Sequence, residues 1–204
     1  MIMKNLFNFC AAAALSVAFV SCGGGQQDST RDAKDSNAVK MDSTGSDSSR
    51  GTSSIPTSVS KDDAQFVVNT ANAGMTEIQA GQLAQQQGMA KDVKAYGTMM
   101  VKDHTEAADK LKTIAAAKNI TLPAALSPEA QNDLADLQKK QGKDFDKAYL
   151  DKMIDDHKKV ISMFEAESKS GSDADLRAFA DATLHTLRHH LDEAEKCDKM
   201  MKKM

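Results

Sequence analysis

The stretch AKDVKAYGTMMVKDHTEAADKLKTIAAAK, residues 90–118, decides the fold. Counting about 100° per residue along it places the apolar side chains on one stripe that also contains a histidine. This stripe consists of Val93, Tyr96, Met100, His104, Ala107 and Leu111. An amphipathic pattern of this length predicts a long helix that buries one face.

Three other segments show the same helical period, and none alternates with the period of two that is typical of a β-strand. Ser60 can cap the first helix, and Gly88 and Gly171 end the first and third. The four long helices are predicted at residues 61–87, 90–118, 143–168 and 173–200. Short turns join the first two helices and the last two, so the members of each pair must run antiparallel.

The connection between the second and third helices is much longer. Within it, Ser127-Pro128-Glu129 starts a short helix with an N-cap serine, a first-turn proline and an early acid, and Gly142 breaks that helix. One long crossover is typical of ferritin-like bundles. We therefore predict an all-α, ferritin-like four-helix bundle with a long crossover containing a short helix. A plain up-and-down bundle with a decorated loop is the alternative.

The first residues have the pattern of an export signal, with Lys4, an apolar run over residues 6–20, and Ser21 before Cys22. The pattern resembles a lipobox, which implies cleavage before Cys22 and acylation of that residue, although Phe19 stands where leucine is usual. An ordinary signal peptide with an incidental cysteine is the alternative. Lipid on Cys22 predicts a membrane-anchored protein of the cell envelope, with the outer membrane, facing the periplasm or the cell surface, as the expected location.

Residues 22–60 are rich in Ser, Asp and Gly and almost free of aliphatic side chains. Such a segment cannot bury enough apolar surface to offset its ordering entropy, so we predict a disordered tether. The predicted organisation is a lipoprotein signal peptide at 1–21, the tether at 22–60 and the bundle at 61–204.

Composition argues against several functional classes. The formal net charge is only −3, and no basic stripe with interleaved aromatic residues is present, so a nucleic-acid partner is not expected. Cys197 is the one cysteine left after cleavage and lipidation, which excludes an intramolecular disulfide and a zinc site built on paired cysteines. No nucleophile stands beside a base in a recognisable arrangement, so the interpretation leans away from an enzyme.

Each predicted long helix carries one polar group on its inward face, near the level of the helix middle. These groups are Glu77, His104, His157 and His190. A buried carboxylate is costly unless it is paired or binds a metal, and one carboxylate with three imidazoles suits a first-row divalent ion. We predict one site for a transition metal such as Fe, Mn, Zn or Cu. The alternative is a Glu/His hydrogen-bond network without metal.

The second and third helices share a pattern at a constant offset: Ala95-Tyr96, Met100 and Asp103-His104 recur as Ala148-Tyr149, Met153 and Asp156-His157. Asp103 and Asp156 are candidates to accept a hydrogen bond from an imidazole of a neighbouring helix. The two methionines, one turn before the histidines, are interpreted as core residues, with a soft-ion site as the alternative.

These motifs resemble a known family. The stretches that carry the resemblance are MTEIQAG (75–81), MMVKDHT (99–105), Leu122-Pro123, Phe145-Asp146 with Tyr149, His157 and Phe164, and Thr183-Leu184 with Leu187 and His190-Leu191. They are similar to the exported bacterial proteins grouped as domain of unknown function 4142, which implies a ferritin-like fold and no established common activity. Glu77 and the three inward histidines match that family's pattern, whereas His185 stands where the family usually has proline.

The resemblance to ferritin-like proteins does not extend to their di-iron chemistry. Di-iron bundles carry Glu three residues before His on two helices. Here those positions are Val101, Ile154 and Leu187, so the carboxylates are too few. The sequence therefore favours a cell-envelope lipoprotein that binds one metal ion, in metal handling or stress protection. The alternative is a non-catalytic structural or interaction module of the envelope.

Overall fold

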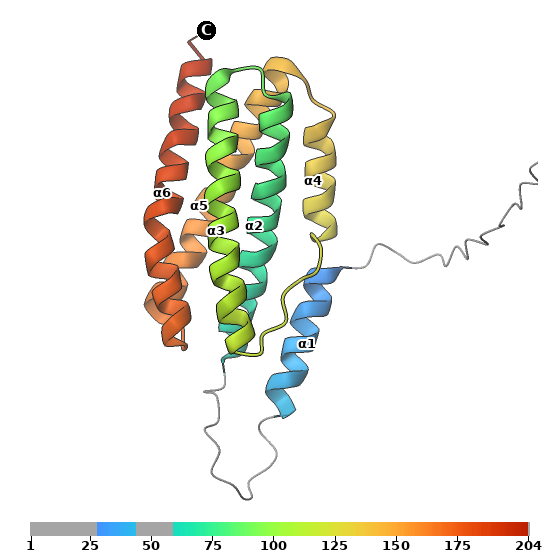
Figure 1. Cartoon of the computed structure of the whole chain (residues 1–204), viewed down its shortest axis with the longest axis vertical. Coiled ribbons are helices and arrows are strands. Elements are labelled where there is room, and N and C mark those ends of the chain that lie inside the picture. The colour runs from blue at the N-terminus through green and yellow to red at the C-terminus, as the bar shows by residue number, and fades with distance from the viewer. Residues whose placement is uncertain (1–27, 44–58, 204) are drawn as a thin grey trace, which may run out of the picture.

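The computed structural model describes residues 28–43 and 59–203. The described residues contain no β-strand, and their six helices are α1 (Ser29–Ser43), α2 (Lys61–Gln87), α3 (Lys91–Ala117), α4 (Pro128–Gln138), α5 (Gly142–Ser170) and α6 (Ala174–Met201) (Figure 1). The four long helices α2, α3, α5 and α6 form the bundle. The predicted all-α, ferritin-like architecture is confirmed.

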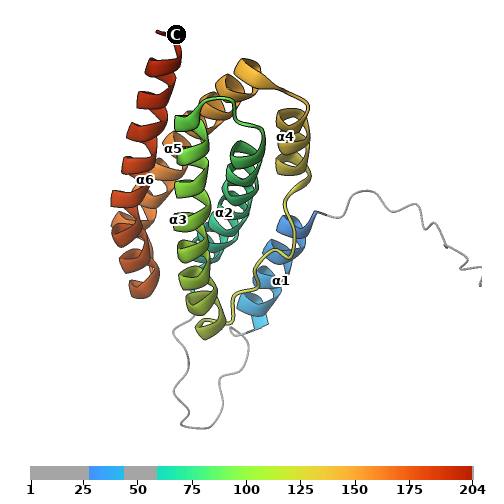
Figure 2. The same ribbon diagram turned by 45° about the horizontal axis from the view of Figure 1, so that its top comes forward.

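The order of the helices follows from the crossover between α3 and α5. The chain leaves α3 at one end of the bundle, returns through a loop and α4 along the outside of α2, and enters α5 at the other end (Figures 1 and 2). In the bundle, α2 packs against α3 and α5, and α6 packs against α3 and α5. Neighbouring helices therefore run antiparallel, and α3 and α5 lie diagonally and run parallel. The plain up-and-down alternative is wrong.

Two buried aspartates tie each helical hairpin to the other. Asp63 at the start of α2 accepts hydrogen bonds from the backbone N–H groups of residues 172 and 173, at 2.9 and 3.1 Å, in the α5–α6 turn. Asp146 at the start of α5 accepts from the N–H groups of residues 89 and 90, at 2.8 and 2.7 Å, in the α2–α3 turn. These carboxylates satisfy turn amides that would otherwise lack partners, and so fix the relative height of the two hairpins.

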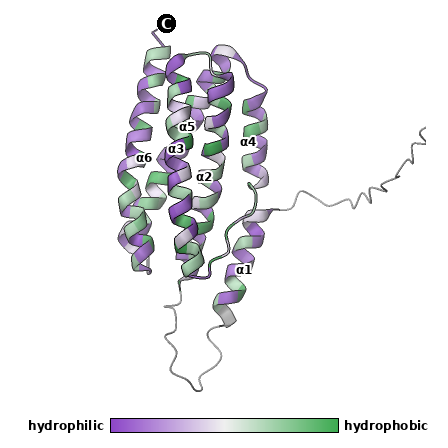
Figure 3. Ribbon diagram, viewed as in Figure 1, coloured by the Kyte–Doolittle hydropathy of each residue, from purple (hydrophilic) through white to green (hydrophobic). Residues whose placement is uncertain are grey.

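Hydrophilic and hydrophobic residues both occur along every bundle helix (Figure 3), and the buried hydrophobic residues form two clusters at successive levels. One cluster contains Tyr96, Met100, Tyr149 and Met153, and the other is built around Phe66, Phe164 and Phe179. In every long helix, the inward polar residue falls between the stretches that supply the two clusters. The core therefore leaves one level of the bundle to polar side chains.

Helix α1 corrects the expectation that residues 22–60 form a disordered tether, because Ser29–Ser43 is helical and packs on α2 and on the crossover loop. The side-chain amide of Asn37 pairs with the backbone of Thr121, donating to its carbonyl at 3.0 Å and accepting from its N–H at 2.7 Å. Lys40 donates to the carbonyl of Asn119 at 3.0 Å. Apart from Ala33 and Met41, the helix docks through hydrogen bonds, so its sequence lacks the apolar stripe that would predict a packed helix.

The remaining N-terminal predictions concern residues 1–27 and 44–58. The signal peptide, the acylated Cys22 and the rest of the tether lie outside the described residues. Within the described ranges, no helix combines the length and apolar character needed to cross a membrane.

Candidate metal centre

The structure brings together the four inward polar residues, each from a different bundle helix. Glu77 comes from α2, His104 from α3, His157 from α5 and His190 from α6, and all four are buried. The three imidazole rings form a nearly equilateral triangle, with centroid separations of 5.7, 5.1 and 5.4 Å. One ring nitrogen from each histidine lies within 4.8 Å of those of the other two.

Hydrogen-bond partners define which ring nitrogens of His157 and His190 are free. Nδ1 of His157 lies 2.8 Å from the carbonyl oxygen of Met153, which can only accept, so Nδ1 carries the proton. Nε2 of His190 lies 3.1 Å from Oδ2 of Asp103 and donates to that carboxylate. The opposite nitrogens, His157 Nε2 and His190 Nδ1, are 3.4 Å apart. With these tautomers, two lone pairs face each other in the core.

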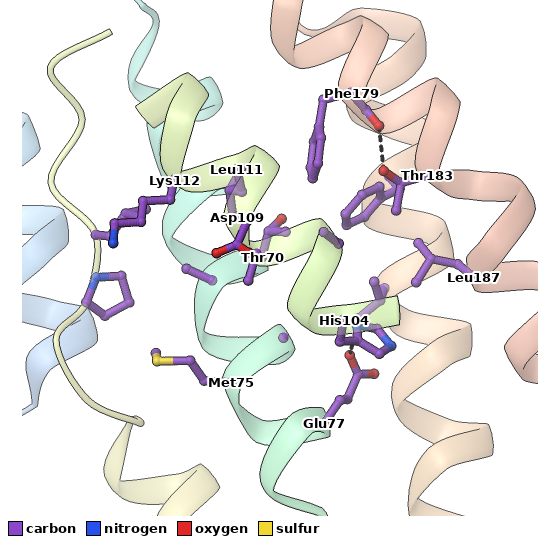
Figure 4. A pocket seen from close by; sticks show the side chains of 18 residues that line it. Thr70, Met75, Glu77, His104, Asp109, Leu111, Lys112, Phe179, Thr183 and Leu187 are labelled. Carbon is purple, nitrogen blue, oxygen red and sulfur yellow. Dashed lines mark hydrogen bonds and ion pairs between the residues drawn. The ribbon is translucent and has the colours of Figure 1, made fainter. Parts of the chain in front are cut away.

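His104 completes the triangle from α3. Its Nδ1 lies 3.2 Å from Oε2 of Glu77, and the two side chains face each other in the close-up of Figure 4. Its Nε2 is buried without a hydrogen-bond partner. Glu77 also places Oε1 at 3.5 Å from Nδ1 of His157. The carboxylate therefore approaches both rings at Nδ1, and leaves Nε2 of each ring as the nitrogen with the free lone pair. In this position it orients the two rings.

Burial controls the protonation of these groups. It lowers the pKa of His104 to about 4, and it lowers that of His190 to about 4 despite the hydrogen bond to Asp103. Burial also lowers the pKa of His157. In the same environment the pKa of Glu77 is raised to about 7 by burial, although His157 opposes this shift. At neutral pH the imidazoles are uncharged, which is the form that binds metals.

The two aspartates that precede the histidines have different surroundings. Asp103 accepts from His190 on the neighbouring α6, as described. Asp156 differs from its predicted role, because its Oδ2 lies 3.0 Å from Nζ of Lys152 and no hydrogen bond joins it to a described imidazole. Lys152 also binds Asp133 of α4 at 2.8 Å, so Asp156 lies at the α4-facing edge of its helix.

The other candidate ligands lie elsewhere. His185 and His189 are exposed. Met100 and Met153 are fully buried in the first hydrophobic cluster, as expected for core residues. Cys197 is a buried free thiol in the same cluster.

A cavity of about 200 Å³ adjoins the histidine triangle, and sequence reasoning did not predict it. Glu77 and His104 lie at one end, and Phe164, Phe179 and Leu187 contribute to its apolar wall (Figure 4). Small residues of α2, among them Ala71 and Gly74, border it. The run of small residues before Glu77 was the one signal in the sequence for this cavity. The signal is not sufficient, because the side chains of the neighbouring helices decide whether the space is filled.

The chemistry of the donor set fits a borderline divalent ion. Each imidazole has one nitrogen engaged by Met153, Asp103 or Glu77 and one left without a protein donor. Metal-binding histidines show this arrangement, in which a carbonyl or carboxylate fixes the tautomer. Three neutral nitrogen donors suit Zn²⁺ or Cu²⁺ better than Mn²⁺.

Comparison with known proteins identifies a family and a fold. The family model described as "Domain of unknown function (DUF4142)" matches residues 48–197. No curated protein matches the chain. The crystal structure of a DUF305 fragment from Deinococcus radiodurans is similar, with a TM-score of 0.62 and 12% sequence identity, over 72% of this chain and 99% of the fragment. At that identity the likeness shows the fold alone.

Proposed function

We propose that this chain, which belongs to the DUF4142 family, binds one divalent transition-metal ion through His104, His157 and His190. The observation that carries the proposal is the 3.4 Å approach of His157 Nε2 to His190 Nδ1, when both nitrogens are acceptors by virtue of their other partners. Two facing lone pairs on buried side chains are unfavourable, and a shared cation removes that conflict.

Glu77 and Asp103 serve this site by orienting imidazoles. Asp103 fixes the tautomer of His190, and Glu77 lies against Nδ1 of His104. Their negative charge also increases the basicity of the rings they contact. Because all three ligands are imidazoles, we expect the order of affinity Cu²⁺, then Zn²⁺, then Fe²⁺ and Mn²⁺.

The test is metal retention by the purified protein, prepared without a histidine tag. The protein is stripped with a chelator, incubated separately with Fe²⁺, Mn²⁺, Zn²⁺ or Cu²⁺, desalted and analysed by mass spectrometry for metal content. We expect about one equivalent of Zn²⁺ or Cu²⁺, the stoichiometry of one three-histidine site. The double variant His104→Ala, His157→Ala is expected to retain none.

A matched control separates the site from surface histidines. The double variant His185→Ala, His189→Ala removes two exposed imidazoles and should retain the wild-type amount of metal. If the buried double variant still binds stoichiometric metal, the assignment is wrong. If wild-type protein retains no metal and the buried variant only loses stability, the four residues form a structural hydrogen-bond network, as in a non-catalytic envelope module.

We also propose that the site operates in the cell envelope, in metal handling or stress protection, on a protein held to a membrane by lipid on Cys22. The support is the signal-like N-terminus and the cysteine that follows it. Cys22→Ala should abolish incorporation of labelled fatty acid and move the protein out of the membrane fraction. Unchanged membrane association and labelling in that variant would contradict the anchor.

A further inference from the structure

The cavity beside the histidine triangle is lined mainly by apolar side chains and by a few polar groups. It is formed by α2, α3, α5, α6 and the crossover loop. Phe164 and Phe179 stand in its wall with ring centroids 5.9 Å apart, next to Leu111 and Leu187. An apolar cavity of about 150 Å³ holds a benzene molecule. At about 200 Å³, this cavity has room for one aromatic ring with a substituent.

Three residues of the lining carry a buried polar atom without a hydrogen-bond partner. These atoms are Oε1 of Glu77, which lies 3.5 Å from Nδ1 of His157, Oγ1 of Thr70 and the metal-site nitrogen Nε2 of His104. Glu77 as a whole is only 2% exposed. A buried acceptor without a donor is costly, so the two oxygens favour a ligand that supplies an O–H group.

The charges around the cavity define the class of head group. Lys112 is the one lysine or arginine among the described lining residues, and its side chain is exposed. No described cation therefore stands inside to receive a carboxylate or phosphate, and Glu77 would repel such an anion when ionised. A neutral hydroxyl satisfies Glu77 without bringing in a second negative charge.

We propose that this cavity binds a small phenol, with its ring between the apolar walls and its hydroxyl donating to the carboxylate of Glu77. The proposal goes beyond metal binding and does not depend on it, because neither of the two orphan oxygens is assigned as a metal ligand. A phenol combines the three features that the cavity selects: a flat apolar body, a single donor and no charge at neutral pH.

Gly74 offers a way to close the cavity without disturbing the fold. It borders the cavity on α2, and a Cβ added there meets no atom within 4 Å. The variant Gly74→Leu can therefore place its side chain in the open space. Replacing glycine within a helix also favours the helix, so Gly74→Leu is expected to stay folded, and its circular dichroism melting curve checks this.

The experiment is a titration of the metal-free protein, labelled with ¹³C at its methionine methyl groups, with phenol and with toluene. Met75 borders the cavity and reports binding, and the exposed Met89 in the α2–α3 turn is the internal control. We expect a saturable shift of the Met75 signal with phenol, no such shift in Gly74→Leu, and an unchanged Met89 signal.

A second variant tests the hydrogen bond. In Glu77→Leu, phenol should bind about tenfold or more weakly, because a bond to a carboxylate is lost, whereas toluene should bind as in wild type. Toluene binding also shows that the cavity is intact. The proposal is overturned if phenol gives no saturable shift in wild type, if Gly74→Leu binds it equally well, or if Glu77→Leu weakens both ligands alike. Gly74→Leu should retain wild-type metal, so failure here is distinguishable from failure of the metal site.

Discussion

Replacing Glu77 by glutamine should stabilise the metal-free protein at alkaline pH. Burial raises the pKa of Glu77 from 4.5 to about 7, so the folded protein must ionise a carboxylate in an unfavourable environment. A shift of this size corresponds to about 3 kcal/mol at a pH above both values. Glutamine keeps the shape and removes the charge. It also weakens the contact with His104, by about 1 kcal/mol, which leaves a net gain of about 2 kcal/mol.

The sign of the pH dependence follows from the raised pKa. Glu77 contributes its full stability below pH 4.5, and this contribution is lost as the pH rises through about 7. The advantage of Glu77→Gln should therefore be largest at pH 8 and disappear towards pH 4.5. The histidines titrate in both proteins, so their contribution largely cancels in the difference.

The assay is urea and thermal unfolding of the chelator-treated proteins at pH 8 and pH 5, followed by circular dichroism. A gain of about 2 kcal/mol raises the melting temperature of a domain of this size by roughly 5 °C. With saturating Zn²⁺ this advantage should shrink or vanish, because loss of a group that orients a metal ligand typically weakens metal affinity about 10–100-fold, or about 1.4–2.7 kcal/mol. A Glu77→Gln protein that is less stable than wild type at pH 8 without metal would refute the reasoning about burial. Equal zinc affinity would refute the role of Glu77 at the site.

Three other perturbations test the packing, the docked helix and the titration of the histidines. Gly97→Ala should lower the free energy of unfolding by about 1–3 kcal/mol, because the new Cβ would lie 2.8 Å from a carbonyl oxygen of α2. Unchanged urea unfolding of this variant would contradict the close contact. Asn37→Ala should speed amide exchange across residues 29–43 but not in the bundle, and equal protection of α1 in both proteins would show that other contacts hold it. In the metal-free protein, the lowered pKa values of His104, His157 and His190 predict a fall in stability as the pH drops from about 6.5 towards 4. The raised pKa values of the two buried glutamates, Glu77 and Glu167, oppose this fall, but three groups act against two; a urea midpoint that stays constant over this range would contradict the prediction.

The fold was predictable because its signals are local. The helical periods, the cap at Ser60, the start at Ser127 and the breaks at Gly88 and Gly171 depend on neighbouring residues only, and each helix end lies within a few residues of the prediction. Short turns then require antiparallel pairs. Helix α1 was not predicted because few of its contacts are apolar, among them those of Ala33 and Met41, and the others include side-chain hydrogen bonds of Asn37 to a loop about eighty residues away in the sequence.

The site was predictable in part for a related reason. Angular counting identifies which polar residues face inward, and in an antiparallel bundle groups near the middle of their helices meet at one level. Counting does not reveal which nitrogen an imidazole presents. That depends on tertiary partners such as the Met153 carbonyl and Asp103, and it explains why Asp103 and Asp156, equivalent in the sequence pattern, have different partners. The cavity depends on side chains that do not fill a space, and no residue pattern encodes that directly.

The energetics of the polar level support the proposed metal binding. Leucine-sized side chains at these positions would pack the gap between two hydrophobic clusters without desolvating a carboxylate or opposing two lone pairs. Instead the core holds Glu77 with a raised pKa and sets His157 Nε2 against His190 Nδ1 at 3.4 Å. Each feature disfavours the metal-free fold, and a divalent cation at the triangle relieves both, because it accepts the lone pairs and offsets the buried negative charge. Functional sites are expected to contain residues that destabilise the ligand-free protein and are stabilised by the ligand. Without such a role, simple hydrophobic substitutions at these positions would remove the unfavourable energy.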